Sequence, residues 1–139
     1  MINVRYEYLE DVATADIAFK AQGDNMNELF ENAAFALSET MVETENLKEV
    51  IVKNINLEET DLEQLLFLFL SEIVYLKDVD LLFFSRFEVK IDGCKLAAKI
   101  YGEKLNGNMN LKTDIKAITM HMLKIFKKDK YYATVVLDV

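Results

Sequence analysis

The chain has 139 residues, 52% of them hydrophobic, and its 16 basic and 24 acidic residues give a formal net charge of −8. This size favours one domain, spanning residues 1–139, and the acidic balance disfavours direct nucleic-acid binding. No uncharged run of about 20 apolar residues occurs, so we expect no membrane span. The N-terminus lacks a secretory pattern and Cys94 is the only cysteine, which excludes an intramolecular disulfide and predicts a cytoplasmic protein.

The first third of the chain predicts two strands and a helix. Period-two alternation predicts strands over residues 6–9 and 16–21. A helix should follow Gly23, with Asp24 or Asn25 as its cap and Glu28 three residues after Asn25. Its apolar face recurs at intervals of three and four residues: Met26, Leu29, Phe30, Ala33, Ala34, Leu37 and Met41.

The remaining two thirds predict one more helix among strands. Residues 49–55 read as a strand, and a helix should begin at Thr60, with Glu63 at capping-box spacing and residues 65–70 apolar all round. Strands should follow over residues 83–91 and 94–100, joined by a turn at Asp92-Gly93, and over 115–125 and 131–138. We therefore expect an α+β domain, an antiparallel or mixed β-sheet with two helices packed on one face.

The sequence carries no self-sufficient catalytic set. It has no Gly-rich phosphate loop, no Cys/His zinc spacing and no nucleophile elbow. Cys94 shares strand phase with Leu96, which is more typical of a small core residue than of a nucleophile. His121 is the only conventional general base, and we favour a buried or edge histidine over a catalytic one.

Two aspartates lie in apolar surroundings. Asp16 follows Thr14-Ala15 at the start of a predicted strand, and Asp138 lies in Val135-Val136-Leu137-Asp138-Val139. If Val139 is the true terminus, its α-carboxylate lies beside that of Asp138. Clustered oxygen anions repel unless a cation neutralises them, and such sites suit Ca²⁺, Mg²⁺ or Mn²⁺. The alternative is two separate aspartates, one at a strand start and one in solvent.

Other charged residues have structural readings of their own. Asp24 suits a helix cap, and Asp11 suits a solvated loop. Lys116 reads either as an exposed strand lysine or as a contact for an anionic group. The same two readings apply to Arg86, for which Glu88 is a same-face partner.

A series of motifs running nearly end to end resembles the archease family, small accessory proteins of RtcB-type RNA ligases. No single motif is as specific as a zinc signature, but the motifs follow in the family's order. They are Tyr6-Glu7-Tyr8-Leu9-Glu10, Thr14-Ala15-Asp16-Ile17, residues 29–37, Asp61-Leu62-Glu63-Gln64-Leu65-Leu66, Phe69-Leu70-Ser71-Glu72, Phe84-Ser85-Arg86-Phe87-Glu88-Val89, Gly102-Glu103, residues 114–119 with His121, and residues 135–139.

This resemblance implies a divalent metal ion held by Asp16, Asp138 and Val139. It also implies Asp11, Asp24 and Lys116 as functional neighbours. Two departures from the family pattern concern a His that often precedes Thr-Ala-Asp, replaced here by Asp11-Val12-Ala13, and a Tyr that often precedes the later His, replaced here by Met120.

The resemblance further implies an activator rather than an enzyme. RtcB-type ligases join RNA ends, as in tRNA splicing and tRNA processing, through a guanylated histidine with GTP and Mn²⁺, and the family speeds guanylation and allows multiple turnover. We therefore expect an RtcB-type RNA ligase as the partner. The alternatives are a non-catalytic binding or chaperone-like module and a stand-alone metal-dependent hydrolase, for which His121 is the only evident base.

Overall fold

The computed structural model describes residues 5–10 and 16–139. Within these residues the elements are, in chain order, β1 (Tyr6–Leu9), β2 (Asp16–Gly23), α1 (Met26–Met41), the 3-10 turn η1 (Thr44–Asn46), β3 (Ile51–Glu58), α2 (Leu62–Asp80), β4 (Leu82–Asp92), β5 (Lys95–Lys104), β6 (Ala117–Lys127) and β7 (Tyr131–Asp138). Neither helix in this described part is apolar enough over its length to cross a membrane.

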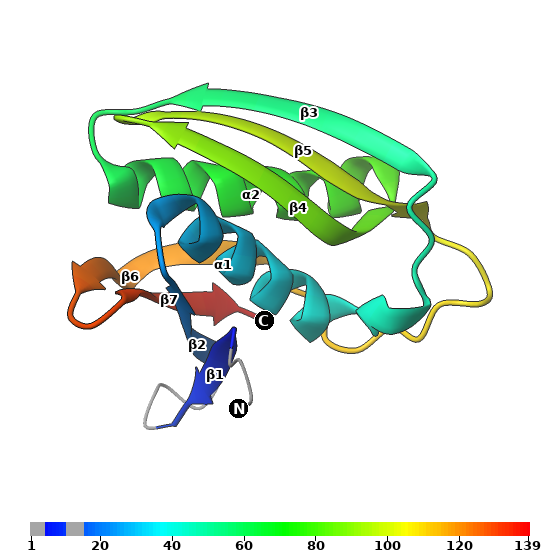
Figure 1. The fold of residues 1–139 in the computed structure, drawn as a ribbon. Helices are drawn as coiled ribbons and strands as arrows, with labels where there is room; N and C mark the ends of the chain where they lie inside the picture. The colour runs from blue at the N-terminus through cyan, green and yellow to red at the C-terminus, as the bar shows by residue number, and fades with distance from the viewer. Residues whose placement is uncertain (1–4, 11–15) are drawn as a thin grey trace.

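The described strands form two antiparallel sheets, one in the order β1-β2-β7-β6 and one in the order β3-β5-β4. Helix α1 packs against β4 and β2, and α2 packs against β6 and more lightly against β3 and β4. The helices thus lie between the two sheets (Figure 1). The α+β class with two helices and antiparallel strands is confirmed, and the division of the strands into two sheets is an addition to the prediction.

Both helices begin at a side-chain cap. Asn25, one of the two predicted caps, caps α1, where its Oδ1 accepts a hydrogen bond of 2.9 Å from the Glu28 amide, so Asp24 is not the cap. Helix α2 is capped by Asp61, one residue after the predicted Thr60, and the Asp61 Oδ1 accepts from the Gln64 amide at 2.8 Å. Glu63 instead accepts a hydrogen bond of 2.9 Å from the Ile125 amide in β6.

The core joins both helices to both sheets. Phe30 of α1 and Phe69 of α2 are fully buried and stack with ring centroids 6.2 Å apart. Phe19 from β2 and Phe84 from β4 are also buried. Each such side chain contributes about 1.5–3 kcal/mol when removed from water, so these rings hold the layers together.

Three strand irregularities differ from the sequence expectations. The β4–β5 turn is Gly93-Cys94, with Gly93 at φ +61°, so Cys94 lies half-buried in a turn rather than in a core strand. Its thiol lies 3.8 Å from the Thr60 carbonyl. Strand β4 changes register between Phe84 and Arg86. Strand β6 changes register between Thr119 and Lys124, which places His121 in an exposed, irregular part of an edge strand.

Candidate carboxylate site at the end of the four-stranded sheet

The first residue of β2 and the last residue of β7 are paired. Asp16 and Asp138 are direct partners in the antiparallel register, which continues through Ile17–Leu137 and Ala18–Val136. Directly opposed residues project from the same face of a sheet, with Cβ atoms about 5 Å apart. The last strand therefore returns beside the segment that begins with Asp16, as the cation hypothesis requires.

The pair lies at an accessible sheet end. Asp16 is half-buried, Asp138 is exposed, and Val139 is half-buried and packs against the core. Neither carboxylate forms an ion pair with another described residue. Two neighbouring carboxylates repel each other, so this arrangement favours a cation that screens both.

The structure supplies two carboxylates here rather than a full ligand set. Residues 5–10 and 16–139 contain no group of three or more His, Cys, Asp or Glu side chains able to hold a metal ion. Ca²⁺ takes about six to eight oxygen ligands, and Mg²⁺ usually keeps several waters. A cation bound to Asp16 and Asp138 would need main-chain oxygens, water or a partner's groups to complete its coordination.

The other sequence-predicted site residues are dispersed. Asp11 lies outside the described residues. Lys116 is exposed beside the pair, and its amide donates a hydrogen bond of 2.8 Å to the Asp138 carbonyl. Asp24 follows the opposite end of β2, roughly 25 Å from Asp16 along the strand, and forms an ion pair of 3.4 Å with Lys130. Lys116 thus borders the site, whereas Asp24 does not.

A shallow pocket of about 370 Å³ adjoins Asp16. Its lining includes Tyr8 from β1, Thr40 from α1, and Lys112 and Thr113 from the segment before β6. The Tyr8 hydroxyl and the Thr40 hydroxyl are hydrogen bonded at 3.0 Å. Sequence reasoning missed this lining because the residues come from three separate segments with no shared motif.

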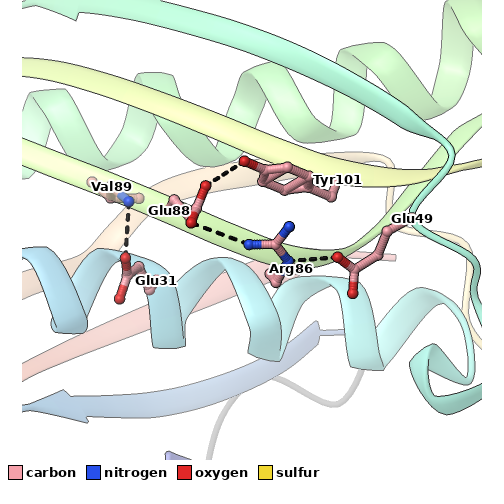
Figure 2. Close-up of polar contacts among 6 residues, drawn as sticks. All are labelled: Glu31, Glu49, Arg86, Glu88, Val89 and Tyr101. Carbon is pink, nitrogen blue, oxygen red and sulfur yellow. Dashed lines mark hydrogen bonds and ion pairs between the residues drawn. The ribbon is translucent and has the colours of Figure 1, made fainter.

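A second polar network lies on the three-stranded sheet (Figure 2). Arg86 stacks on Tyr101, with its guanidinium carbon 3.6 Å from the ring centroid, and forms ion pairs of 2.5 Å with Glu49 and 3.1 Å with Glu88. The Tyr101 hydroxyl donates to Glu88 and lowers the pKa of that carboxyl. The predicted Arg86–Glu88 pairing is confirmed. The contacts join the segment before β3 to β4 and β5.

The fold and the paired carboxylates define a small α+β protein with an oxygen-rich site at one sheet end. Comparison with known proteins then places it: the model of the Archease protein family matches residues 6–139, so the chain belongs to this family.

Relatives and a solved structure agree with this placement. The chain is 41% identical to the protein archease of Pyrococcus abyssi, with 88% of this chain and 89% of the relative covered. It is 37% identical to that of Sulfurisphaera tokodaii, with 97% and 99% covered. The solution structure of Methanobacterium thermoautotrophicum protein 1598 is similar with a TM-score of 0.86 and 31% identity over 97% of this chain and 99% of that one.

Proposed function

We propose that this protein activates an RtcB-type RNA ligase in tRNA splicing, promoting ligase guanylation and multiple turnover, without ligating RNA itself. Membership of the archease family supports the partner. The single structural observation that carries the proposal is the direct pairing of Asp16 with Asp138. The setting of this activity is the cytoplasm.

A divalent cation fits the donor set at this sheet end. Asp16 and Asp138 would supply carboxylate oxygens and Val139 a main-chain oxygen, all hard ligands that suit Ca²⁺, Mg²⁺ or Mn²⁺. A bound cation would neutralise negative charge that accumulates on a nucleotide during nucleotidyl transfer. The chain's own residues hold these oxygens at the edge of the molecule, where Asp138 is exposed to a partner.

The surface charge also suits a helper that contacts protein rather than RNA. A net charge of −8 repels a phosphate backbone and attracts a basic protein surface. We expect the ligase to present such a surface, because a protein that binds RNA neutralises its phosphates with basic side chains. Contact between the two proteins should therefore weaken as ionic strength rises, because the attraction between exposed charges is screened by salt.

A guanylation assay tests the proposal. Ligase, GTP and Mn²⁺ are combined with wild-type protein, with Asp138→Asn or with Asp16→Asn. We expect wild-type protein to speed guanylation and both variants to return the rate to that of ligase alone, because each removes one charged ligand of the cation. Asp92→Asn is the matched control: it neutralises an exposed aspartate at the far end of β4 and should stimulate fully.

Two results would contradict the proposal. Full stimulation by Asp16→Asn with unchanged thermal stability would exclude the carboxylate mechanism. Equal stimulation of a ligase that is already guanylated would point instead to a binding or chaperone-like module.

A further inference from the structure

Lys77 is the only charged residue among the described residues that is buried, with 6% of its surface exposed. It lies in the last turn of α2 and takes no part in the carboxylate pair. A buried ammonium is costly unless its donors are satisfied. Its contacts therefore identify the acceptors that satisfy the buried ammonium and the segment that it holds.

All three donors of the Lys77 ammonium have acceptors in the chain. Nζ lies 2.6 Å from Asp114 Oδ1, 2.7 Å from the Ile115 carbonyl oxygen and 2.7 Å from Asp78 Oδ1. Burial alone would lower the pKa of Lys77, but the hydrogen bonds to Asp114 and Asp78 outweigh it and the pKa is raised. Two of the three contacts are to the segment that precedes β6.

That segment continues directly to the carboxylate site. Ile115 is fully buried, so its side chain and its carbonyl are both held in the interior. The next amide, that of Lys116, donates to the Asp138 carbonyl at 2.8 Å. Ala117 then pairs with Asp138 as β6 begins. A continuous series of contacts therefore runs from the end of α2 through residues 114–116 to the end of β7.

We propose that Lys77 is a positioning residue for the Asp16–Asp138 pair: it anchors residues 114–116, which hold the last residue of β7 in register opposite β2. This inference rests on the proposed function for its cation, but the positioning itself can be measured without one. The Lys77 side chain is itself buried, although its partners Asp78 and Asp114 are exposed, and it acts on the pair through residues 114–116.

Amide hydrogen exchange, measured by NMR without added metal, tests the positioning. In Lys77→Met, which replaces the lysine with an unbranched apolar side chain one atom shorter and removes its donors, we expect the Lys116 amide to exchange about tenfold faster or more, because its hydrogen bond is no longer anchored. Amides in the middle of β7, such as that of Val135, should keep their wild-type protection. Asp78→Asn is the matched control, because it leaves both contacts to residues 114–115 intact.

A Ca²⁺ titration of the same variants tests the consequence. We expect Lys77→Met to bind Ca²⁺ about tenfold more weakly, as is typical when a residue that positions metal ligands without contacting the metal is lost. Lys77→Arg should recover affinity toward that of the wild type, and Asp78→Asn should bind Ca²⁺ as the wild type does. If Lys77→Met fails to fold, Asp114→Asn provides the test, since Asp114 is largely exposed and its loss weakens the same anchor in the same direction.

The outcomes are distinguishable. Wild-type exchange at Lys116 in both Lys77→Met and Asp114→Asn would overturn the positioning role. Equal acceleration at Lys116 and Val135 would also overturn it, because it would show a global loss of stability. If the wild-type protein binds no cation while Lys116 exchange responds as expected, the proposed function fails and the positioning role stands.

Discussion

Gly102 lies where β5 passes the register change in β4, and its lack of a side chain allows the two backbones to approach. A Cβ atom at this position would lie 1.9 Å from the Phe83 carbonyl oxygen and 2.7 Å from the Phe84 Cα. Both are backbone atoms in a buried part of the sheet, so neither can move aside cheaply. The close approach is thus a requirement of the fold at one residue.

We expect Gly102→Ala to lower the free energy of unfolding by about 3 kcal/mol or more, because a methyl group must be forced into a filled space. Gly107→Ala is the control, since a Cβ there meets nothing within 4 Å. Urea denaturation of both variants measures the difference. Equal stability of the two variants would show that β4 and β5 can separate at Gly102 without cost.

At the scale of elements, helix side chains also occupy the edges of the sheets. Glu31 and Asn27 of α1 accept hydrogen bonds from the Val89 and Ile91 amides of β4, at 2.9 and 2.8 Å. Glu63 of α2 does the same for Ile125 of β6. Edge strands with free amides can pair with other chains, and these contacts block such pairing at β4 and β6.

The cap of α2 gives a prediction for an element. Asp61→Ala should lower the free energy of unfolding by about 1 kcal/mol, because the Gln64 amide loses its acceptor and the positive end of the helix dipole loses a negative charge. Asp80→Ala, at the opposite end of α2, should be neutral or slightly stabilising, because a carboxylate there faces the negative end of the dipole. Thermal unfolding followed by circular dichroism compares the two, and a larger loss in Asp80→Ala would contradict the cap assignment.

The type of each helix and strand was predicted from periodicity, but the contacts between these elements were not. The apolar spacing of α1 was predicted correctly, and of the two caps left open, Asp24 and Asn25, the structure has Asn25. Thr60 and Asp61 can both cap a helix, and the choice depends on Glu63, which is bonded to β6 instead of completing a capping box. The predicted phase of Leu96, Ala98 and Ile100 is correct, but the strand begins after Cys94, because the turn falls at Gly93-Cys94 with Gly93 in the left-handed conformation. The bulges in β4 and β6 depend on partner strands that alternation does not reveal.

For the whole molecule, alternation was likewise not enough to predict the sheet topology or the site. Alternating residues show that a strand has a buried face, but they do not show which sheet it joins, so the two sheets were not predicted. The meeting of Asp16 and Asp138 was inferred from a family resemblance and not from spacing. The β2–β7 register now brings them together from opposite ends of the chain. Tyr8 lies in the first motif of the resemblance but had no predicted role at this end, and Lys112, which borders the same end, lies in none of the motifs.

The central claim is that this paired sheet end binds a cation, and Mn²⁺ added to ¹⁵N-labelled protein tests it most directly. Paramagnetic Mn²⁺ broadens the amide signals nearest to it. At substoichiometric Mn²⁺ we expect the signals of Asp16, Asp138 and Val139 to broaden first, and the effect to disappear in Asp138→Asn but persist in Asp92→Asn. Broadening centred on other carboxylates, or an unchanged pattern in Asp138→Asn, would contradict the claim.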